Sequence, residues 1–173
     1  PVEDQANLLA KLVPEAKTVG IMYHSSEDNS ILQAEMAQQA LEALGLTVEI
    51  FTCADATEVQ AVAQSAAGKV DALYLPTDNL MADTIATISM VCTPAGVPII
   101  CGESNMVNGG GTATYGIDYY KLGEQTAAQA IRILSEGADI STMPIEYYDA
   151  ELELVVNEDV MAQLGLTVPD DLQ

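Results

Sequence analysis

The sequence is poor in basic and aromatic residues, and the first shortage excludes a class of partner. Only five Lys and Arg stand against 26 Asp and Glu, which gives a formal net charge of -21; there is one Phe and no Trp. A surface this acidic repels phosphate backbones and anionic membranes, so we expect no nucleic-acid partner. The acidic residues are dispersed along the chain, which is typical of a solvated, highly soluble surface.

Histidine and the common catalytic motifs are also scarce. His24 is the only histidine, so a histidine-based nucleophilic triad would have to use it, and no Gly-x-Ser-x-Gly motif is present. The glycine run at 109–111 lacks the following Lys and Ser or Thr of a phosphate loop, and no Gly-x-Gly-x-x-Gly follows the first predicted strand. Scattered acidic residues give no metal-ligand spacing. We therefore expect no enzyme activity, no metal and no cofactor.

Cysteines and long apolar runs are limited too. Cys53, Cys92 and Cys101 form no Cys-x-x-Cys pair, and their odd number argues against a full disulfide framework. Cys101 lies in an apolar run, which predicts a small core residue. No segment reaches the roughly 18 uninterrupted apolar residues of a membrane span, and no signal peptide is visible. Because a helix-like run begins directly at Pro1, we expect the chain to start inside a longer gene product.

Strand-like and helix-like runs alternate along the 173 residues, of which 49% are hydrophobic. The predicted strands are 18–23, 47–53, 72–75, 97–101, 112–117 and 151–156. The predicted helices are 32–44, 57–67 with Thr57 as its N-cap, 80–92, a short turn at 103–107, 119–135 and 157–164. This alternation, with mostly apolar strands, predicts an α/β fold: a three-layer sandwich with a mostly parallel sheet flanked by helices.

The carboxyl ends of parallel strands meet at one edge of a sheet, and ligands bind there. The loops after strands one, three, four and five should therefore share one rim. In the first loop, hydroxyls and free backbone N–H groups at a helix start suit a carboxylate. Simple N-capping by Ser26 or Asp28 explains the same residues equally well.

The other rim loops contribute carboxylates and tyrosines. Asp78 directly follows a buried strand and could hold an ammonium group or cap the next helix; we favour the ligand role. Asp118 could likewise take a ligand amine or cap the long helix that follows it. Tyr119 and Tyr120 could stack on a ring, although packing between lobes is the more common use of such residues. Glu103 lies in the remaining loop.

Three segments, taken in order, resemble one family. They are V-G-I-M-Y at 19–23 with S-S-E-D-N-S at 25–30, G-K-V-D-A-L-Y-L-P-T-D-N at 68–79, and G-I-D-Y-Y-K-L-G at 116–123. The set resembles the substrate-binding proteins of ABC transporters of the tryptophan/tyrosine type, which have the type I periplasmic-binding-protein fold. The resemblance covers nearly the whole chain, and Pro-Thr-Asp-Asn and Gly-Ile-Asp-Tyr-Tyr are its most specific parts.

The resemblance implies two α/β lobes joined by three crossovers, with the ligand between them. This chain is similar to the second lobe and the tail. The implied parts are 1–117 for that lobe, 118–146 for a helix that docks on the first lobe, and 147–173 for a tail that returns to the second lobe. Without a first lobe, the apolar face of helix 119–135 needs another partner, which predicts a homodimer or docking back onto this lobe.

The resemblance also implies a small-molecule ligand, an amino acid with an aromatic one favoured, delivered to a membrane permease from an extracytoplasmic lipoprotein or a periplasmic protein. Ser25, Ser26 and Asn29 would hold its carboxylate, and Asp78 with Asn79 its amine. The full implied ligand set is Tyr23, Ser25, Ser26, Asn29, Thr77, Asp78, Asn79, Glu103 and Asp118. Tyr23-His24 stands where relatives often have Asn-Pro. One lobe should bind poorly, because lobe closure supplies much of the contact.

The sequence is compatible with two other functions. The same fold could act as the ligand-sensing domain of a signalling or regulatory protein, which a neighbouring DNA-binding or kinase segment would favour. An enzyme on a flavodoxin-like lobe would need a phosphate or nucleophile motif, which the sequence lacks.

Overall fold

The computed structural model describes residues 1–172, which divide into two compact units. The first unit comprises Pro1–Gly116 and the segment from Leu154 onward, and the second comprises Ile117–Glu153. The helices are α1 (Val2–Leu12), α2 (Asp28–Ala43), α3 (Val59–Ala67), α4 (Asn79–Cys92), α5 (Ser104–Asn108), α6 (Tyr119–Leu134), α7 (Glu158–Leu164) and the 3-10 turn η1 (Asp170–Leu172). The strands are β1 (Thr18–His24), β2 (Thr47–Cys53), β3 (Ala72–Leu75), β4 (Ile99–Cys101), β5 (Ala113–Gly116) and β6 (Glu153–Val156).

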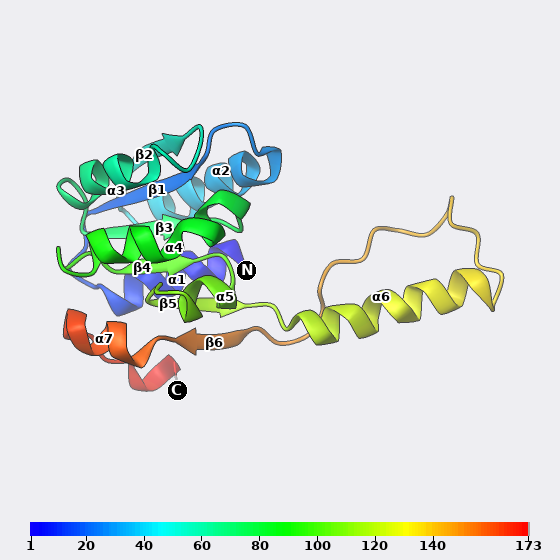
Figure 1. The fold of residues 1–173 in the computed structure, drawn as a ribbon. Helices are drawn as coiled ribbons and strands as arrows, with labels where there is room; N and C mark the ends of the chain where they lie inside the picture. The colour runs from blue at the N-terminus through cyan, green and yellow to red at the C-terminus, as the bar shows by residue number, and fades with distance from the viewer. Residues whose placement is uncertain (173) are drawn as a thin grey trace. The chain divides into compact units, whose positions relative to one another are not determined.

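The strands form one sheet in the order β2-β1-β3-β4-β5-β6, with β6 at the edge (Figure 1). The pairs β1/β2, β1/β3, β3/β4 and β4/β5 are all parallel. The predicted α/β class with a mostly parallel sheet is therefore confirmed. The chain moves outward from β1 to β2 and then returns past β1 to β3, so the winding direction reverses between β1 and β3. Such a switch point leaves a crevice at the carboxyl ends of the two strands.

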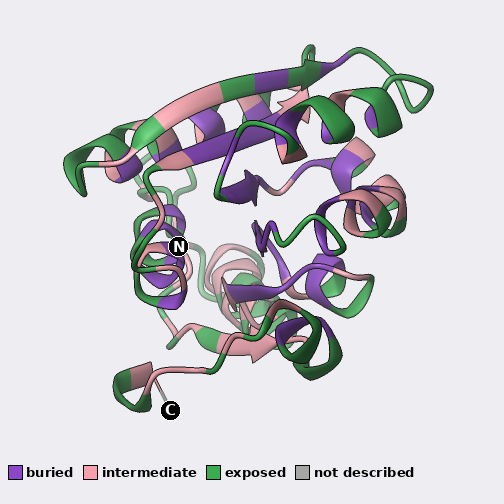
Figure 2. Ribbon diagram, turned by 90° about the vertical axis from the view of Figure 1, so that its left-hand side faces the viewer, coloured by how far each residue is buried: buried purple, intermediate pink, exposed green. Residues whose placement is uncertain are grey.

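Each face of the sheet is covered by its own set of helices. Alternate residues of a strand point to opposite faces, and in β3 Leu73 and Leu75 pack toward α3, α4 and α5, whereas Ala72 and Tyr74 pack toward α1 and α2. Both faces are buried along the central strands β3 and β4, whereas the edge strands β2 and β6 are partly exposed (Figure 2). Cys101 is fully buried in the first of these cores, as its apolar run predicted. The helices on the two faces make the three predicted layers.

The second unit contains α6 and the segment that runs back from it. Gln125 Nε2 donates to the carbonyl oxygen of Tyr147 at 2.7 Å, and the guanidinium of Arg132 pairs with Glu146. No residue of α6 is classed as buried. Leu134 is 83% exposed, and Ile131, Ile140, Ile145 and Tyr147 are exposed as well. Most of the large apolar side chains of this unit are therefore exposed to solvent.

Several predicted boundaries and caps differ from the structure. Thr57 is not an N-cap: α3 begins two residues later, after Glu58, and the N–H and hydroxyl of Thr57 both donate to Asp55 Oδ1 in a local turn. Neither Ser26 nor Asp28 caps α2, whose N-cap is Glu27 and whose first residue is Asp28. Strand β4 begins at residue 99 rather than 97, and β6 at 153 rather than 151. The first helix was visible in the sequence only as a helix-like run.

Candidate functional site

The loops that follow β1, β3 and β4 meet at the switch point of the first unit. The best-defined link between them is Asp78, which is 2% exposed. Its Oδ2 accepts the backbone N–H of His24 at 2.8 Å, and its Oδ1 accepts that of Met81 at 2.9 Å. The first bond joins the end of β1 to the loop after β3, and the second caps α4. The capping role considered for Asp78 is therefore present in the structure.

Glu27, a residue outside the predicted ligand set, connects the same two loops from the solvent side. Its Oε1 accepts from Asn79 Nδ2 at 3.0 Å and from Asn29 Nδ2 at 3.1 Å. The backbone N–H of Asn79 adds a longer contact, 3.3 Å to Oε2 and 3.4 Å to Oε1. Asn29 Nδ2 also donates to the carbonyl oxygen of Thr77 at 3.0 Å. An amide nitrogen has two hydrogens, so Asn29 keeps none for a ligand carboxylate in this arrangement.

Thr77 and Gly102 bring the loops after β3 and β4 together. The backbone N–H of Thr77 donates to Gln33 Oε1 at 3.0 Å, and its Oγ1 donates to the carbonyl oxygen of Gly102 at 3.2 Å. A Cβ on Gly102 would lie 2.6 Å from the carbonyl carbon of Pro76, and closer still to the nitrogen of Thr77. Only glycine permits this approach, so Gly102 fixes the spacing of the two loops.

The loop after β1 offers the exposed hydroxyls of the rim. Ser25 and Ser26 are exposed, and among residues 1–172 no partner of Ser25 Oγ is found, whereas Ser26 Oγ lies 3.5 Å from His24 Nδ1. His24 Nε2 lies 3.0 Å from the carbonyl oxygen of Ala54. Tyr23 is half-buried and packs against the core under α1 and α2. Two hydroxyls and a histidine ring thus remain at the edge of the crevice.

The two remaining predicted residues have structural partners of their own. Glu103 is buried at 9% exposure and caps α5, accepting from the N–H groups of Asn105 and Met106 at 2.9 Å each. Asp118 belongs to the second unit, where its Oδ1 accepts from Tyr120 N at 2.8 Å and caps α6. Lys121 Nζ lies 3.7 Å from Asp118 Oδ2. The structure thus brings Ser25, Ser26, Asn29, Thr77, Asp78, Asn79 and Glu103 to the rim loops, with Tyr23 at the end of β1, and their ligand roles remain predictions.

The rim of the first unit is negatively charged. Lys17 and Lys69 precede β1 and β3 and so lie toward the opposite edge of the sheet, and Lys11 pairs with Asp171 at 2.6 Å. The other two basic residues of the chain, Lys121 and Arg132, belong to the second unit. Burial, and then nearby carboxylates, raises the pKa of the Cys53 thiol at the end of β2 to about 11, so this thiol stays protonated and unreactive at neutral pH. The negative charge of the rim loops suits a cation or an ammonium group.

Sequence reasoning missed Glu27 and Gln33, although Glu27 stands inside the Ser-Ser-Glu-Asp-Asn-Ser segment. The available signal was a carboxylate directly before a helix, which also describes a solvated N-terminal acid. The position of the Glu27 side chain depends on Asn79, 52 residues later, which supplies two of its hydrogen-bond donors. No pattern local to residues 25–30 contains that information.

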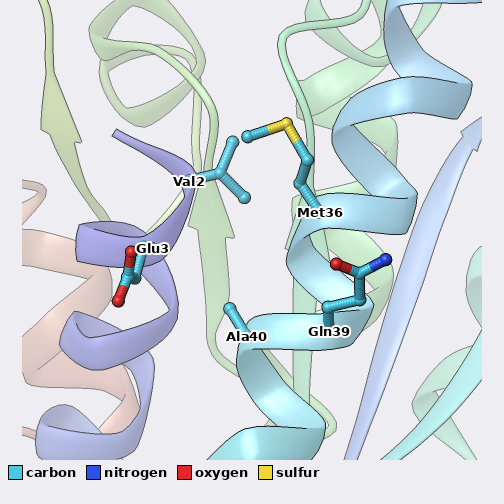
Figure 3. Close-up of a pocket in the computed structure, with 5 residues that line it drawn as sticks. All are labelled: Val2, Glu3, Met36, Gln39 and Ala40. Atoms are coloured by element: carbon cyan, nitrogen blue, oxygen red, sulfur yellow. The ribbon is translucent and has the colours of Figure 1, made fainter.

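A hollow on the first unit lies away from the rim residues. A shallow hollow of about 330 Å³ between α1 and α2 is lined by Val2, Glu3, Met36, Gln39 and Ala40 (Figure 3). None of the predicted ligand residues lines it. Within residues 1–172, no group of three or more His, Cys, Asp or Glu could hold a metal ion. In the same range, no helix is long and apolar enough to cross a membrane.

A switch-point crevice with polar rim loops is where a doubly wound α/β lobe binds a small ligand. The profile of the family described as ABC transporter substrate binding protein matches residues 1–173. The chain therefore belongs to the ABC transporter substrate-binding protein family, and the family predicted from the three sequence segments is confirmed.

Known relatives agree in sequence and in fold. The tyrosine-binding protein of Clostridioides difficile (strain R20291) is 33% identical over 165 residues, which are 95% of this chain and 47% of that protein. The crystal structure of an ABC domain in complex with L-Trp from Streptococcus pneumonia has a TM-score of 0.88 and 32% identity, and the match covers 99% of this chain and 58% of that one. The ligand-free, open structure of a substrate-binding protein with adhesive properties from Clostridium difficile has a TM-score of 0.81 and 36% identity over 98% of this chain and 57% of its own.

These matches confirm the predicted type I periplasmic-binding fold. The chain spans about half the length of the relatives it matches, at 47% to 58% of each.

Proposed function

We propose that this chain forms the second lobe of an ABC transporter solute-binding protein that captures an amino acid, with an aromatic one favoured, between two lobes. The observation that carries the proposal is the switch-point rim, where loops from β1, β3 and β4 join polar side chains around one crevice in a member of this family. The names of two relatives support the ligand class, because one is a tyrosine-binding protein and the other is a complex with L-Trp.

The rim supports a division of the ligand's two charged ends. Its carboxylates suit the ammonium end. The exposed hydroxyls of Ser25 and Ser26, with the backbone N–H groups at the start of α2, suit the carboxylate end. Both donor hydrogens of Asn29 are used within the chain, so its proposed carboxylate contact would require the side chain to rearrange. Tyr23, Thr77, Glu103 and Asp118 complete the proposed set.

The whole protein would bind its ligand without converting it and deliver it to a membrane permease from an extracytoplasmic, lipid-anchored or periplasmic location. The family supports binding without conversion, because its members are described as substrate-binding proteins and a relative is named a tyrosine-binding protein. The exposed apolar side chains of α6, such as Ile131 and Leu134, would dock on the first lobe. We expect the chain by itself to form a dimer through α6 or to fold this helix back, and light scattering that shows a strict monomer with α6 loose would contradict both.

The test is a thermal-shift screen of the full-length polypeptide against the twenty amino acids, with residues 1–173 measured in parallel. A ligand at 100 times its Kd adds about 2.7 kcal/mol to a protein that binds it only when folded. A shift with Trp, Tyr or Phe in the full-length polypeptide, and a much smaller one with residues 1–173, is the expected result. If no amino acid shifts the transition of the full-length polypeptide, the ligand class is wrong.

A further inference from the structure

We propose that Glu27 is the residue that contacts the ligand ammonium group and sets specificity for it, while the buried Asp78 is a positioning residue. This inference rests on the proposed function and changes the assignment of the amine contact. The two carboxylates differ in exposure and in the hydrogen bonds that they already accept. Asp78 is 2% exposed, and each of its oxygens already accepts a short bond from a backbone N–H, from His24 and from Met81. Little of this carboxylate can be reached by a ligand.

Glu27 has the opposite properties. It is half-buried, and its Oε1 takes the two amide donors of Asn29 and Asn79, while its Oε2 accepts only the longer 3.3 Å contact from Asn79 N. A carboxylate oxygen has two lone pairs, so Oε2 keeps acceptor capacity. The two asparagines hold the side chain in place through Oε1 and leave Oε2 available.

The neighbouring amides strengthen the preference for a cation. Because Asn29 and Asn79 turn their Nδ2 atoms toward Glu27, their Oδ1 atoms are free of the bond, and neither Oδ1 accepts a hydrogen bond within residues 1–172. An ammonium group has three donors and no acceptor. Three oxygens of this cluster therefore keep acceptor capacity, Glu27 Oε2 and the two Oδ1 atoms, and acceptors are what an ammonium group requires.

The charges around Glu27 also favour a cationic ligand group. None of the four ion pairs found in residues 1–172 involves Glu27, and none of the five basic residues of the chain belongs to the rim loops. Asp78 and Glu103 are further acidic residues of the rim loops, and their carboxylates accept only backbone N–H groups. A carboxylate that loses water without gaining a cation is costly, and a charge-assisted bond to a ligand ammonium would compensate that loss.

The experiment uses the full-length polypeptide and the isosteric variant Glu27→Gln, with two kinds of probe. The first are L-tryptophan and L-tyrosine. The second are their analogues without the amino group, indole-3-propionate and 3-(4-hydroxyphenyl)propionate, measured by displacement of the amino acid in isothermal titration. Loss of one charge-assisted bond should weaken amino-acid binding about ten- to a hundredfold. Binding of the analogues should stay the same or improve, because they have no ammonium group to lose.

The matched control is Asp28→Asn, which removes the same charge at the next position, where the exposed side chain has no hydrogen bond in residues 1–172. It should change the affinity for either probe less than threefold. Equal losses of both probes in Glu27→Gln would show that Glu27 only positions the loops, and no loss of either would show that it does not contact the ligand; both results overturn the inference. If the wild-type protein binds no amino acid at all, the proposed function fails first, and the inference falls with it.

Discussion

The carboxylate of Asp78 accepts the backbone N–H of His24 at 2.8 Å, and this single bond joins the end of β1 to the loop that follows β3 across the switch point. The same side chain caps α4 through Met81 N. One buried carboxylate thus satisfies two backbone donors, one of them 54 residues away in the sequence and the other three residues away. Because a buried N–H without a partner is costly, the free energy of unfolding should depend strongly on this residue.

We expect Asp78→Ala to lower the free energy of unfolding by about 2–4 kcal/mol, since it removes a helix cap and leaves the N–H of His24 without its acceptor. Urea unfolding followed by circular dichroism measures the change. Asp83→Ala is the control, because Asp83 is exposed on the same helix without a hydrogen bond in the described residues, and it should stay within about 0.5 kcal/mol. Equal small effects for both variants would contradict a structural role for Asp78.

Much of this site could be read from the sequence because it depends on strand ends. Apolar runs located β1, β3 and β4 to within two residues, and parallel topology then placed their following loops on one edge. The capping alternatives for Asp78 and Asp118 were also visible, since an acid directly before a helix needs only local geometry.

The interactions between loops could not be predicted in the same way. Glu27 and Asn79, and likewise Gln33 and Thr77, are more than 40 residues apart, and their pairing depends on how closely the loops approach. The long-range hydrogen bonds of Gln5 could not be predicted either, because the residue lies inside a helix-like run. The prediction of Thr57 as a cap was wrong because its N–H and hydroxyl both donate to Asp55 Oδ1. These two bonds form a local turn, and the helix begins only after it.

Gln5 and Tyr74 form a buried polar pair between α1 and β3. Tyr74 Oη donates to Gln5 Oε1 at 2.8 Å, and Gln5 Nε2 donates to the carbonyl oxygens of Tyr115 at 2.9 Å and Gly102 at 3.1 Å. Gln5 is 1% exposed, and burial raises the pKa of the Tyr74 hydroxyl, which keeps it neutral and able to donate. The pair therefore links the first helix to the loops beside the rim.

We expect Gln5→Leu to cost about 2–4 kcal/mol of unfolding free energy and Tyr74→Phe about 1–3 kcal/mol, because each leaves a buried polar group without a partner. The double variant should cost less than the sum by about 0.5–3 kcal/mol, since both partners of one bond are then removed together. Gln64→Leu, on the exposed side of α3, is the control and should change little. Strict additivity in a urea-unfolding cycle would mean that the two side chains do not interact.

Gly102 sets the spacing between the loops after β3 and β4, because a Cβ there would collide with the backbone of Pro76 and Thr77. Backbone atoms cannot rotate away as a side chain can, so Gly102→Ala should cost about 1–3 kcal/mol of unfolding free energy. It should also weaken ligand binding by the full-length polypeptide, since the Thr77 loop must shift. Gly68→Ala, where the nearest atom would be 3.7 Å away, should leave binding and thermal unfolding nearly unchanged. Binding that survives Gly102→Ala intact would show that the loop spacing is not needed.

Asp71 makes the amino edge of the sheet sensitive to acid. Its Oδ2 accepts the backbone N–H groups of Lys17 at 2.8 Å and Thr18 at 2.9 Å. The bond from Thr18, then that from Lys17, and the nearby charge of Lys17 lower the pKa of this carboxyl below its ordinary value. A lowered pKa in the folded state means that the group stabilises the fold at pH values above its unfolded pKa of about 3.9, and that this contribution is lost as the pH falls through the folded pKa.

We therefore expect Asp71→Asn to lower the free energy of unfolding at pH 7 by a few tenths to about 1 kcal/mol, a small effect because the carboxylate is exposed to solvent. The difference between the wild type and the variant should shrink as urea unfolding is repeated at decreasing pH below about 5, because the unfolded wild type binds a proton at this carboxylate before the folded state does. The titration of the other acidic residues is common to both proteins and cancels in the difference. A difference that is constant from pH 7 to pH 3 would show that the two backbone bonds do not depend on the charge of Asp71.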